Sequence, residues 1–465
     1  MKKITIKSNY KKIISDTLTP VSIFLKVRDV YNKVFLLESS DYKGRDNSYS
    51  YICFDSVSNI SIDENKVFID FFNRNEQYEI NNKHDAKYYL NNYLERFDSN
   101  DNKFSFPTNG LFGFISFNSI KYFDKISLSS PKEIKIPDIV YHVFKYVIII
   151  NHYKNELFIF EHLYGNDKNS NIKKIKNLIT TKPSNPFSFR LNGPENISLS
   201  NDEFQKLVKM GIKHCKLGDV FQIVLSKRFY QNFKGDEFQV YRALRSINPS
   251  PYLFYFDYGS FKIFGSSPEA QLVIKDNIAS IFPIAGTFRR TGNDEKDKIL
   301  SDNLLDDIKE NSEHVMLVDL ARNDLSKVSA QVIVEKFKEI QYYSHVIHLV
   351  SKVSARVSKN KNIDLISSTF PAGTLSGAPK YKAIELIDNY ESVSREFYGG
   401  AIGYMGFNGD FNHAIVIRSF LSKNRKLYYQ AGAGVVAKSN EKKENDEVYN
   451  KIEALRNAIK LAQKL

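Results

Sequence analysis

The chain has 465 residues, of which 42% are hydrophobic, 26% charged and 14% aromatic. This length and composition exclude a disulfide-stapled mini-protein and a disordered chain, and they leave room for about three domains of ordinary size. The two cysteines, Cys53 and Cys215, have no paired or metal-ligand spacing, which excludes a disulfide framework and a zinc site. The net charge of +13 is spread along the chain as lysines without a nucleic-acid-binding motif, so we expect neither a nucleic-acid nor a membrane partner.

The N-terminus begins with a methionine and two lysines, as a secretion signal does, but further lysines at positions 7, 11 and 12 interrupt any apolar segment. The aliphatic run 147–150 is far shorter than the roughly 20 residues that cross a bilayer. We therefore expect a cytoplasmic protein without a membrane span.

The first part of the chain is rich in predicted strands, at 34–37, 111–117, 146–150 and 157–160. A polar segment with several prolines and glycines follows, which discourages regular structure. We place the domain boundary there, with a strand-rich N-terminal region at 1–182, a linker at 183–198 and a catalytic domain at 199–465.

The second part mixes helices and strands. Apolar residues recur at helical spacing from Phe204 to Cys215, and Gly218 is placed to end that helix. A strand follows at 220–229, and two hairpins are expected at 252–264 and 272–282, turning at Gly259 and Asn277. Helices are predicted at 296–322, 381–389 and from about 443 onward. Helices together with hairpins indicate an α+β fold, with large, mainly antiparallel sheets and helices packed outside.

Two carboxylate pairs, Glu310 with Glu313 and Glu444 with Glu447, each lie three residues apart on a predicted helix, and so on one helical face. Two such faces turned toward each other would offer only oxygen ligands, which suits Mg²⁺. Taken alone, a glutamate pair is more often a solvated face. The apolar segment 315–318 reads as buried and favours the metal for the first pair, since a carboxylate beside a core needs a partner.

Glycine-rich segments at 284–287, 373–380, 398–400 and 432–434 would let the backbone approach a ligand and offer N–H groups to its carboxylates. None is a nucleotide loop, because Pro379 stands before Lys380 where a P-loop needs glycine. Each segment alone is also explained by a structural turn. Arg418 follows an apolar run and is expected to meet a planar anion or to form an internal salt bridge.

Two residues could transfer protons. His348 lies in a predicted apolar strand, where a histidine is more often a satisfied core residue than a catalyst. Glu269 ends the segment 265–269 and has no assigned chemistry on its own.

As a set, these motifs resemble the chorismate-utilising enzymes, and among them the ammonia-using subunits that make anthranilate. The resemblance covers nearly all of 220–447 and is thinner at 36–39 and 110–117; its strongest segments are 221–226, 248–252, 283–287, 313–324 and 373–380. It implies the chorismate-binding enzyme fold and a magnesium-dependent lyase that forms anthranilate and pyruvate, the first step of tryptophan biosynthesis.

The resemblance also implies site residues. Glu313 and Glu447 would bind Mg²⁺, with Glu310 and Glu444 in the outer shell. Glu269 would be the acid that protonates the leaving hydroxyl, His348 would transfer protons in the elimination, and Thr374 would be a nearby positioning group. The substrate chorismate would be held by Gly286, Thr287, Tyr398, Arg418, Gly432, Ala433 and Gly434.

Within the family, Ala285 stands where relatives that make 4-amino-4-deoxychorismate carry a nucleophilic lysine. Gln222 stands where relatives that add water carry a lysine that acts as the base. Alanine cannot act as a nucleophile and glutamine cannot act as a base, so the sequence favours anthranilate as the product. The alternative from the same family is the aminase subunit that makes 4-amino-4-deoxychorismate. A non-catalytic tryptophan-sensing or nucleic-acid-binding protein is the alternative from another class.

The resemblance implies two further partners. The chain shows no glutaminase segment, so ammonia would come from a separate glutamine amidotransferase subunit, in a hetero-tetramer. Tryptophan would act as a feedback inhibitor, bound by Ser39, Pro251, Tyr252 and Leu253. Leu253 often has a methionine counterpart, a swap that conserves volume.

Overall fold

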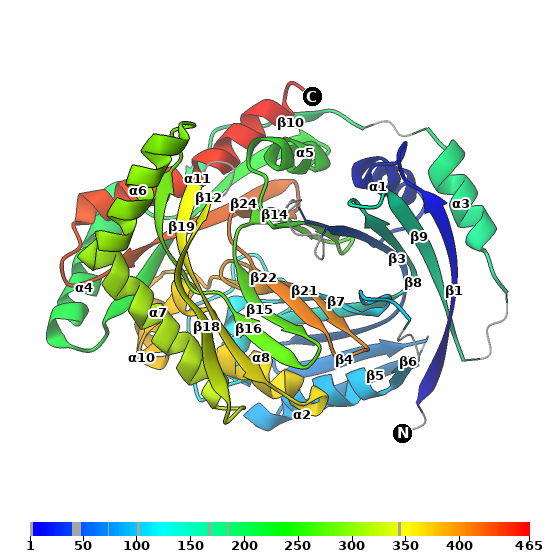
Figure 1. Ribbon diagram of the computed structural model, residues 1–465, viewed down its shortest axis with the longest axis horizontal. Helices are drawn as coiled ribbons and strands as arrows, with labels where there is room; N and C mark the ends of the chain where they lie inside the picture. Colours follow the sequence, from blue (N-terminus) through cyan, green and yellow to red (C-terminus); the bar gives the residue numbers. More distant parts are fainter. Residues whose placement is uncertain are drawn as a thin grey trace.

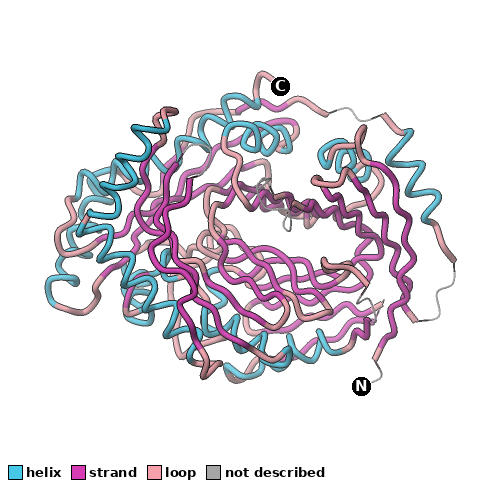
Figure 2. The backbone as a smooth tube through the Cα atoms, viewed as in Figure 1, coloured by secondary structure: helices cyan, strands magenta, loops and turns pink. Residues whose placement is uncertain are grey.

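Two antiparallel sheets face each other, and helices cover their outer sides (Figures 1 and 2). This computed structural model describes residues 3–39, 48–72, 74–99, 103–165, 169–183, 186–342 and 346–465. Every strand pairing described in these ranges is antiparallel except that of β1 with β6.

The first sheet runs from the N-terminal strand to the C-terminal part of the chain. Its strands, in spatial order, are β1 (Ile4–Ile14), β9 (Glu156–Tyr164), β8 (Ile139–Asn151), β3 (Tyr49–Asp63), β2 (Val34–Glu38), β13 (Tyr252–Asp257), β14 (Lys262–Ser267), β23 (Ser419–Lys423), β24 (Lys426–Val435) and β12 (Gln222–Gly235). Short strands complete its edges: β6 (Phe97–Ser99), β10 (Phe189–Leu191), β11 (Asn196–Ile197) and β20 (Gly377–Ala378).

The second sheet shares the long strands β3 and β8 with the first sheet. From its edge it contains β5 (Arg74–Glu79), β4 (Lys66–Phe71), β3, β8, β7 (Gly110–Ile115), β21 (Ala401–Gly406), β22 (Phe411–Ile415), β15 (Ala270–Lys275), β16 (Ile278–Ile281), β19 (Val346–Arg356) and β18 (Val332–Tyr342), with β17 (Ile284–Arg289) beside β16 on β19.

Strand β3 belongs to both sheets because its pairing changes along its length. Residues 51–54 pair with β2 and residues 58–63 with β4, and the register with β8 shifts between Ser56 and Ser58. An irregularity of this kind bends a strand and increases its twist. The N-terminal region therefore supplies the strands that join the two sheets.

An aromatic layer fills the space between the sheets. Phe35, Phe114, Phe254 and Phe256 lie in it, each at most 2% exposed, and the rings of Phe35 and Phe256 stack with centroids 4.3 Å apart. Because side chains alternate along a strand, Leu36 faces the other way, into the core beneath the outer helices. Aromatic rings provide large apolar area for such a layer.

The helices are α1 (Pro20–Arg28), α2 (Lys83–Glu95), η1 (Phe117–Tyr122, a 3₁₀ helix), α3 (Ile172–Thr181), α4 (Asn201–Leu217), α5 (Phe238–Ile247), α6 (Asp294–Asp306), α7 (Ile308–Ser326), η2 (Lys359–Lys361), α8 (Asn362–Thr369), α9 (Gly373–Ser376), α10 (Lys380–Tyr390) and α11 (Glu441–Ala462). Helix α4 shows how local sequence sets such bounds. Ser200 and Glu203 form a capping box at its start, and Gly218 ends it with φ 84°.

The predicted fold class is confirmed, and both predicted hairpins are present as β13 with β14 and β15 with β16. Two expectations need correction. The single helical segment at 296–322 is two helices that break at Asp307, and the strand at 111–117 ends at Ile115 before η1. The segment 315–318 is only partly buried, since Val315 is 40% exposed and Val318 is 4% exposed.

The two regions predicted from the sequence share their sheets. Strand β2 pairs with β13, and β7 pairs with β21, so strands from either side of residues 183–198 are neighbours. Strands β10 and β11 lie inside the segment predicted to be a linker, and both pair with β12.

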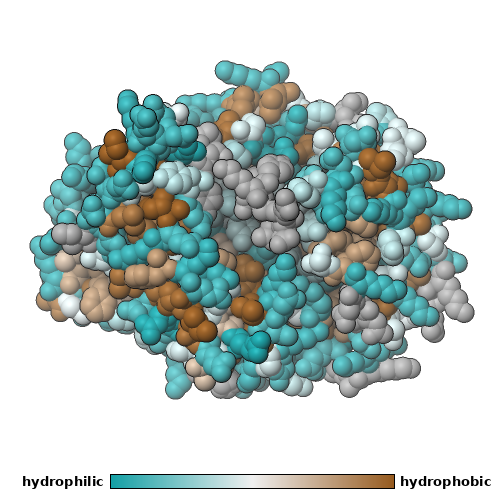
Figure 3. All heavy atoms as spheres, viewed as in Figure 1, coloured by the Kyte–Doolittle hydropathy of each residue, from teal (hydrophilic) through white to brown (hydrophobic). Residues whose placement is uncertain are grey.

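The face of the molecule in Figure 3 is mainly hydrophilic, with smaller apolar patches. Among the described helices, none combines the length and the apolar character needed to cross a bilayer.

Candidate active site

A cavity of about 220 Å³, here called the charged pocket, lies where both sheets meet α9 and α11. It is lined by Val224, Pro268, Glu269, Ile284, His348, Thr374, Leu375, Tyr398, Ile417, Arg418, Gln430, Ala431, Gly432, Gly434 and Lys451. Seven residues predicted from the sequence are therefore brought together here: Glu269, His348, Thr374, Tyr398, Arg418, Gly432 and Gly434.

Glu269 stands on the connection between β14 and β15. The Thr374 hydroxyl donates to its Oε1 at 3.0 Å, and its backbone carbonyl accepts from the Ile415 amide at 3.0 Å. Burial raises the pKa of Glu269 to about 7, although the hydrogen bond from Thr374 and the charge of Arg418 oppose this. At neutral pH a large fraction of this carboxyl group is therefore protonated and able to donate a proton.

Arg418 lies between β22 and β23 with φ 50°, a conformation that non-glycine residues rarely adopt. Its carbonyl accepts from the Ser266 amide at 3.2 Å. Within the described part of the chain, no carboxylate lies within ion-pair distance of its guanidinium. Burial lowers the pKa of Arg418, and the nearest charge that raises it again is Glu269. Among the residues that the structure describes, Arg418 therefore forms no internal salt bridge of the kind considered from the sequence, and it lines the pocket.

His348, on β19, donates through Nδ1 to the carbonyl oxygen of Gly286, 3.2 Å away. A carbonyl only accepts, so Nδ1 carries the proton. Burial lowers the pKa of His348, which keeps the ring neutral at physiological pH. Nε2 of the neutral ring is then the unprotonated nitrogen, which is the state a general base needs.

The strand segment 430–434 of β24 forms one wall of the pocket. Gly432 lies against Tyr398, and the Gly432 amide donates to the Tyr398 hydroxyl. Burial raises the pKa of Tyr398. A Cβ atom at Gly434 would lie 2.7 Å from Nε2 of Gln222, so a larger residue there would require the Gln222 side chain to move. Ala433 alternates to the other face and is buried in the core, which leaves only its backbone for a ligand.

Gly286 adjoins the pocket through its contact with His348. It has φ 66°, and a Cβ atom there would lie 2.5 Å from Leu304 and 3.3 Å from Oε2 of Glu310. Thr287 pairs with His348 across β17 and β19, and its side chain lies outside the described residues.

The two glutamate pairs lie on α7 and α11, and one member of each is found next to a residue at the charged pocket. Glu310 approaches Gly286, and Glu447 pairs with Lys451, a pocket residue, at 2.7 Å. All four glutamates offer oxygen donors, so the chemistry of the donor set fits Mg²⁺. In the described ranges, no three acidic, histidine or cysteine residues lie close enough together to hold an ion. Magnesium therefore stays a prediction.

Lys451 was missed in the sequence analysis. Its Nζ donates to the carbonyl of Gly432 at 2.9 Å and makes the ion pair with Glu447. The available signal was its position four residues after Glu447 on the same predicted helix, which places both on one face. The pocket thus holds a second cation beside Arg418.

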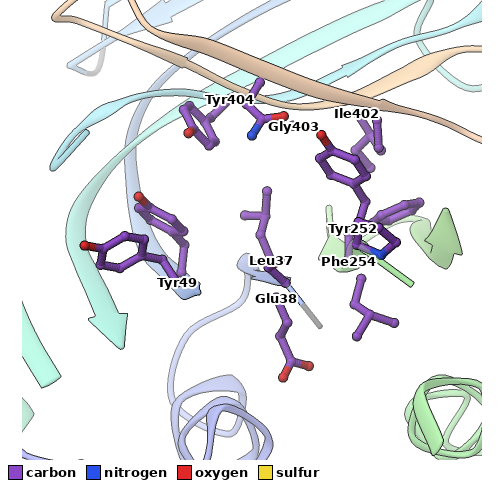
Figure 4. A pocket seen from close by; sticks show the side chains of 14 residues that line it. Leu37, Glu38, Tyr49, Tyr252, Phe254, Ile402, Gly403 and Tyr404 are labelled. Atoms are coloured by element: carbon purple, nitrogen blue, oxygen red, sulfur yellow. The ribbon is translucent and has the colours of Figure 1, made fainter. Parts of the chain in front are cut away.

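A separate cavity of about 180 Å³, here called the aromatic pocket, lies where β2, β13, β21 and β22 meet (Figure 4). Ser39, Pro251, Tyr252 and Leu253, which were predicted to bind tryptophan, all line it. Its other lining residues are Leu37, Glu38, Tyr49, Tyr51, Phe254, Ile402, Gly403, Tyr404, Asn412 and Ala414.

The acid of the aromatic pocket is already paired. Glu38 is 5% exposed and accepts from the Tyr241 hydroxyl at 2.7 Å and from Nε of Arg245 at 3.0 Å. In Figure 4 its carboxylate points away from the ring of Tyr404. The open space is therefore bordered mainly by aromatic and aliphatic side chains.

The two pockets are connected by one hairpin. Tyr252 of the aromatic pocket pairs directly with Ser267, two residues before Glu269 of the charged pocket. The hairpin of β13 and β14 therefore forms a continuous backbone connection between the two pockets.

The sequence matches the chorismate binding enzyme family over residues 34–457. It is 34% identical to anthranilate synthase component 1 of Aquifex aeolicus, an alignment that covers 98% of this chain and 94% of the relative. It is 35% identical to anthranilate synthase component 1 of Acinetobacter calcoaceticus, covering 97% and 95%.

Solved structures show the same likeness to anthranilate synthase component I. Anthranilate synthase component I from Streptococcus pneumoniae superposes with a TM-score of 0.76 at 29% identity, covering 96% of this chain and 100% of that chain. The menaquinone-specific isochorismate synthase from Escherichia coli has a TM-score of 0.73 at 17% identity over 98% and 95%, a likeness of fold alone. The resemblance predicted from the motifs is confirmed, and the chain belongs to the chorismate binding enzyme family.

Proposed function

We propose that this enzyme converts chorismate and ammonia to anthranilate and pyruvate. The observation that carries the proposal is that Arg418, which has no ion-pair partner among the described residues, lines the charged pocket together with a partly protonated Glu269. A dicarboxylate with a hydroxyl leaving group needs these two functions together. The relatives named anthranilate synthase component 1 support the choice of product.

Arg418 is proposed to pair with the enolpyruvyl carboxylate, because a guanidinium matches a planar carboxylate with two parallel hydrogen bonds. The backbone amides of 432–434, with Tyr398, Gly286 and Thr287, would hold the rest of the substrate. Glu313 and Glu447 would hold Mg²⁺, supported by Glu310 and Glu444. The bound ion would supply positive charge for the ring carboxylate.

Glu269 is proposed to protonate the departing hydroxyl as ammonia adds to the ring. Hydroxide is a poor leaving group, and a carboxyl group with a pKa of about 7 is matched to proton donation at neutral pH. The Thr374 hydroxyl, 3.0 Å from Oε1, would fix the orientation of the carboxyl group.

His348 is proposed to remove the ring proton as pyruvate leaves, through the unprotonated Nε2. His348→Met should therefore let the amino-dienoic intermediate accumulate while chorismate is still consumed, detectable by chromatography of the quenched reaction. His214→Gln, at a half-buried histidine paired with Asp219, is the matched control. An unchanged anthranilate yield from His348→Met would contradict the assignment.

The assay that tests the function mixes chorismate, Mg²⁺ and ammonium chloride at alkaline pH and follows anthranilate fluorescence. Formation of the para isomer of aminobenzoate instead would identify the 4-amino-4-deoxychorismate alternative. Ala285 and Gln222 support the ortho product, because neither can act as the lysine of the relatives with other products. Chelation with EDTA should abolish the activity, and restored activity with added Mg²⁺ would support the metal.

We further propose that a glutamine amidotransferase subunit supplies ammonia in a hetero-tetramer, and that tryptophan inhibits by binding in the aromatic pocket. An aromatic cavity of about 180 Å³, bordered mainly by aromatic and aliphatic side chains, suits an indole ring. Tryptophan should inhibit the assay above, whereas phenylalanine at the same concentration should not.

A further inference from the structure

Lys227 is a buried cation that the proposed chemistry does not use. It lies on β12 opposite Ala431 of β24, and it is 0% exposed. Val224 of the same strand lines the charged pocket, and Lys227, three positions later, faces the other way because side chains alternate along a strand. In the described ranges, no carboxylate lies within ion-pair distance of its ammonium group. A buried charge of this kind is costly, so its neighbours must compensate for the lost water.

The neighbours of Lys227 form a cage of two amide oxygens and two aromatic rings. Nζ donates to Oδ1 of Asn201 at 3.0 Å and to Oδ1 of Asn445 at 3.3 Å. It lies 5.3 Å from the ring centroid of Phe204 and 5.0 Å from that of Tyr449. Amide oxygens and ring faces both stabilise an ammonium group without carrying a charge. The first residue of each pair belongs to α4 and the second to α11, so one ammonium group joins β12 to both helices.

The cage is closed by its own hydrogen bonds. The Tyr449 hydroxyl donates to the same Oδ1 of Asn201 at 2.8 Å, so both lone pairs of that oxygen are used. Burial lowers the pKa of Lys227 to about 8, with a smaller contribution from the charge of Arg456, so most of the group is protonated at neutral pH. The caged ammonium group therefore serves the arrangement of the elements around it.

One of these elements, α11, carries three groups of the candidate active site. Lys451 lines the charged pocket, Glu447 pairs with Lys451 at 2.7 Å, and Glu444 precedes Glu447 by three residues on the same helical face. Asn445, which accepts from Lys227, directly follows Glu444 and is 4% exposed. The anchor point therefore lies within one helical turn of both glutamates.

Two side-chain hydrogen bonds hold α11 against the sheet, one on each side of Glu447. Lys227 reaches from β12 to Asn445, and Nζ of Lys451 reaches from the helix back to the Gly432 carbonyl of β24 at 2.9 Å. Apolar contacts beneath a helix are non-directional, whereas hydrogen bonds have a narrow geometry. A rotation of α11 about its axis, or a slide along it, would therefore break a hydrogen bond at one of the two points.

We propose that Lys227 is a positioning residue of the active site, whose caged ammonium group fixes α11 against β12 and so places Glu444, Glu447 and Lys451 at the charged pocket. Lys227 itself contacts no substrate and transfers no proton. This inference rests on the proposed function, because it assigns a supporting residue to the proposed metal and substrate site.

Lys227→Met tests the inference, because methionine keeps an unbranched apolar side chain and removes the charge. Binding of Mn²⁺, a paramagnetic substitute for Mg²⁺, is followed by electron paramagnetic resonance, and the KM for chorismate is measured by anthranilate fluorescence. We expect the dissociation constant of Mn²⁺ to rise about tenfold and the KM for chorismate about fivefold. A change in one measurement alone supports positioning of the glutamates or of Lys451 respectively, and no change in either overturns the inference.

Lys26→Met is the matched control. Lys26 is also a buried lysine, 9% exposed, and it donates to the Ile179 carbonyl at 2.7 Å from α1. Both constants should stay within about twofold of the unchanged enzyme, even if the variant is less stable. Losses equal to those of Lys227→Met would show that removal of any buried lysine has this effect, and would overturn the inference.

A second variant, Asn445→Leu, removes the acceptor on α11 and keeps the lysine. If Lys227 acts through this contact, the double variant should bind Mn²⁺ no more weakly than the weaker single variant. Losses that multiply in the double variant would mean that the two residues act independently, and would overturn the inference.

Failure of the proposed function gives a different result. If the unchanged enzyme binds no Mn²⁺, the proposed metal fails, and if it makes no anthranilate, the proposed reaction fails. Hydrogen exchange then decides the inference by itself, because the amides of 441–447 should exchange about tenfold faster in Lys227→Met than in the unchanged chain. Equal exchange in the two proteins would overturn it.

Discussion

The charged pocket and the aromatic pocket have similar volumes, about 220 Å³ and 180 Å³, but they differ in whether their charged side chains are paired within the protein. In the charged pocket, Arg418 faces the cavity without a protein carboxylate within ion-pair distance in the described chain. In the aromatic pocket, the buried Glu38 is already paired with Arg245 and Tyr241.

This difference supports the proposal that the charged pocket binds an anionic substrate and that the aromatic pocket selects its ligand by shape. A buried cation without a counter-ion is costly unless a ligand supplies the negative charge. A paired acid among tyrosines and phenylalanines has no such need, and its cavity selects for a ring of suitable size. The comparison predicts that substitutions in one pocket leave the binding of the other pocket's ligand unchanged.

The largest effect is expected from Arg418→Ala. Loss of the guanidinium removes two charge-assisted hydrogen bonds, so kcat/KM for chorismate should fall about a thousandfold. Tryptophan binding, measured by calorimetry, should not change. Arg322→Ala, at an arginine that is 56% exposed, is the control and should keep full activity. A thousandfold loss of tryptophan affinity in Arg418→Ala would remove the distinction between the pockets.

Glu269→Gln should lower kcat about a hundredfold and yet stabilise the fold above neutral pH. The folded pKa of about 7 lies above the ordinary 4.5, so the native state binds the proton more tightly and loses stability as pH rises from 4.5 to 7. Glutamine does not titrate, so the variant does not lose stability in this way. Its free energy of unfolding should exceed that of the unchanged chain by about 3 kcal/mol at pH 8 and by about zero at pH 4.

Urea unfolding of Glu269→Gln and of the unchanged chain at both pH values measures this difference. A gain in stability that is equal at pH 4 and pH 8 would mean that the carboxyl group does not titrate as described. A stability gain without loss of activity would contradict the acid role.

Tyr252→Ala tests the aromatic pocket. Removal of a ring from the cavity wall should raise the inhibition constant of tryptophan about tenfold to a hundredfold, with kcat within about twofold of the unchanged enzyme. Tyr153→Ala, at a tyrosine that is 57% exposed, serves as the control. Inhibition that persists in Tyr252→Ala would place the tryptophan site elsewhere.

The smallest effect is expected from Leu253→Met. The two side chains have nearly the same volume, so the inhibition constant of tryptophan should change by less than about threefold. Dose–response curves of the two enzymes in parallel give the comparison. A larger change would show that the aromatic pocket discriminates by detailed shape rather than by volume.

Much of the fold was predictable because its signals are local. The bounds of α4 follow from Ser200, Glu203 and Gly218, and the hairpin of β15 and β16 follows from the turn at Asp276 and Asn277, which both have positive φ. The break at Asp307 was missed, because both flanking segments have helical periodicity. The joining of the two sheets through β3 was missed as well, since strand pairing at long separation leaves no local pattern.

Seven residues that line the charged pocket were singled out from the sequence, but the electrostatics of the pocket were not predicted. The chain shows that an arginine stands at position 418 and a glutamate at position 269, and motif resemblance links them. Only the folded chain shows that Arg418 has no ion-pair partner in the described ranges, that the pKa of Glu269 is about 7, and that Lys451 lines the pocket.

The sequence by itself determined the residue types, the local elements and the family, because helix caps, turns and strand periodicity act over a few residues. Tertiary structure decided which of these residues meet. Thr374 and Glu269 are 105 positions apart and share a hydrogen bond only because tertiary packing brings α9 to the connection that precedes β15. Burial then sets their chemistry, since the free energy of a charge depends on the solvent and the partners left around it.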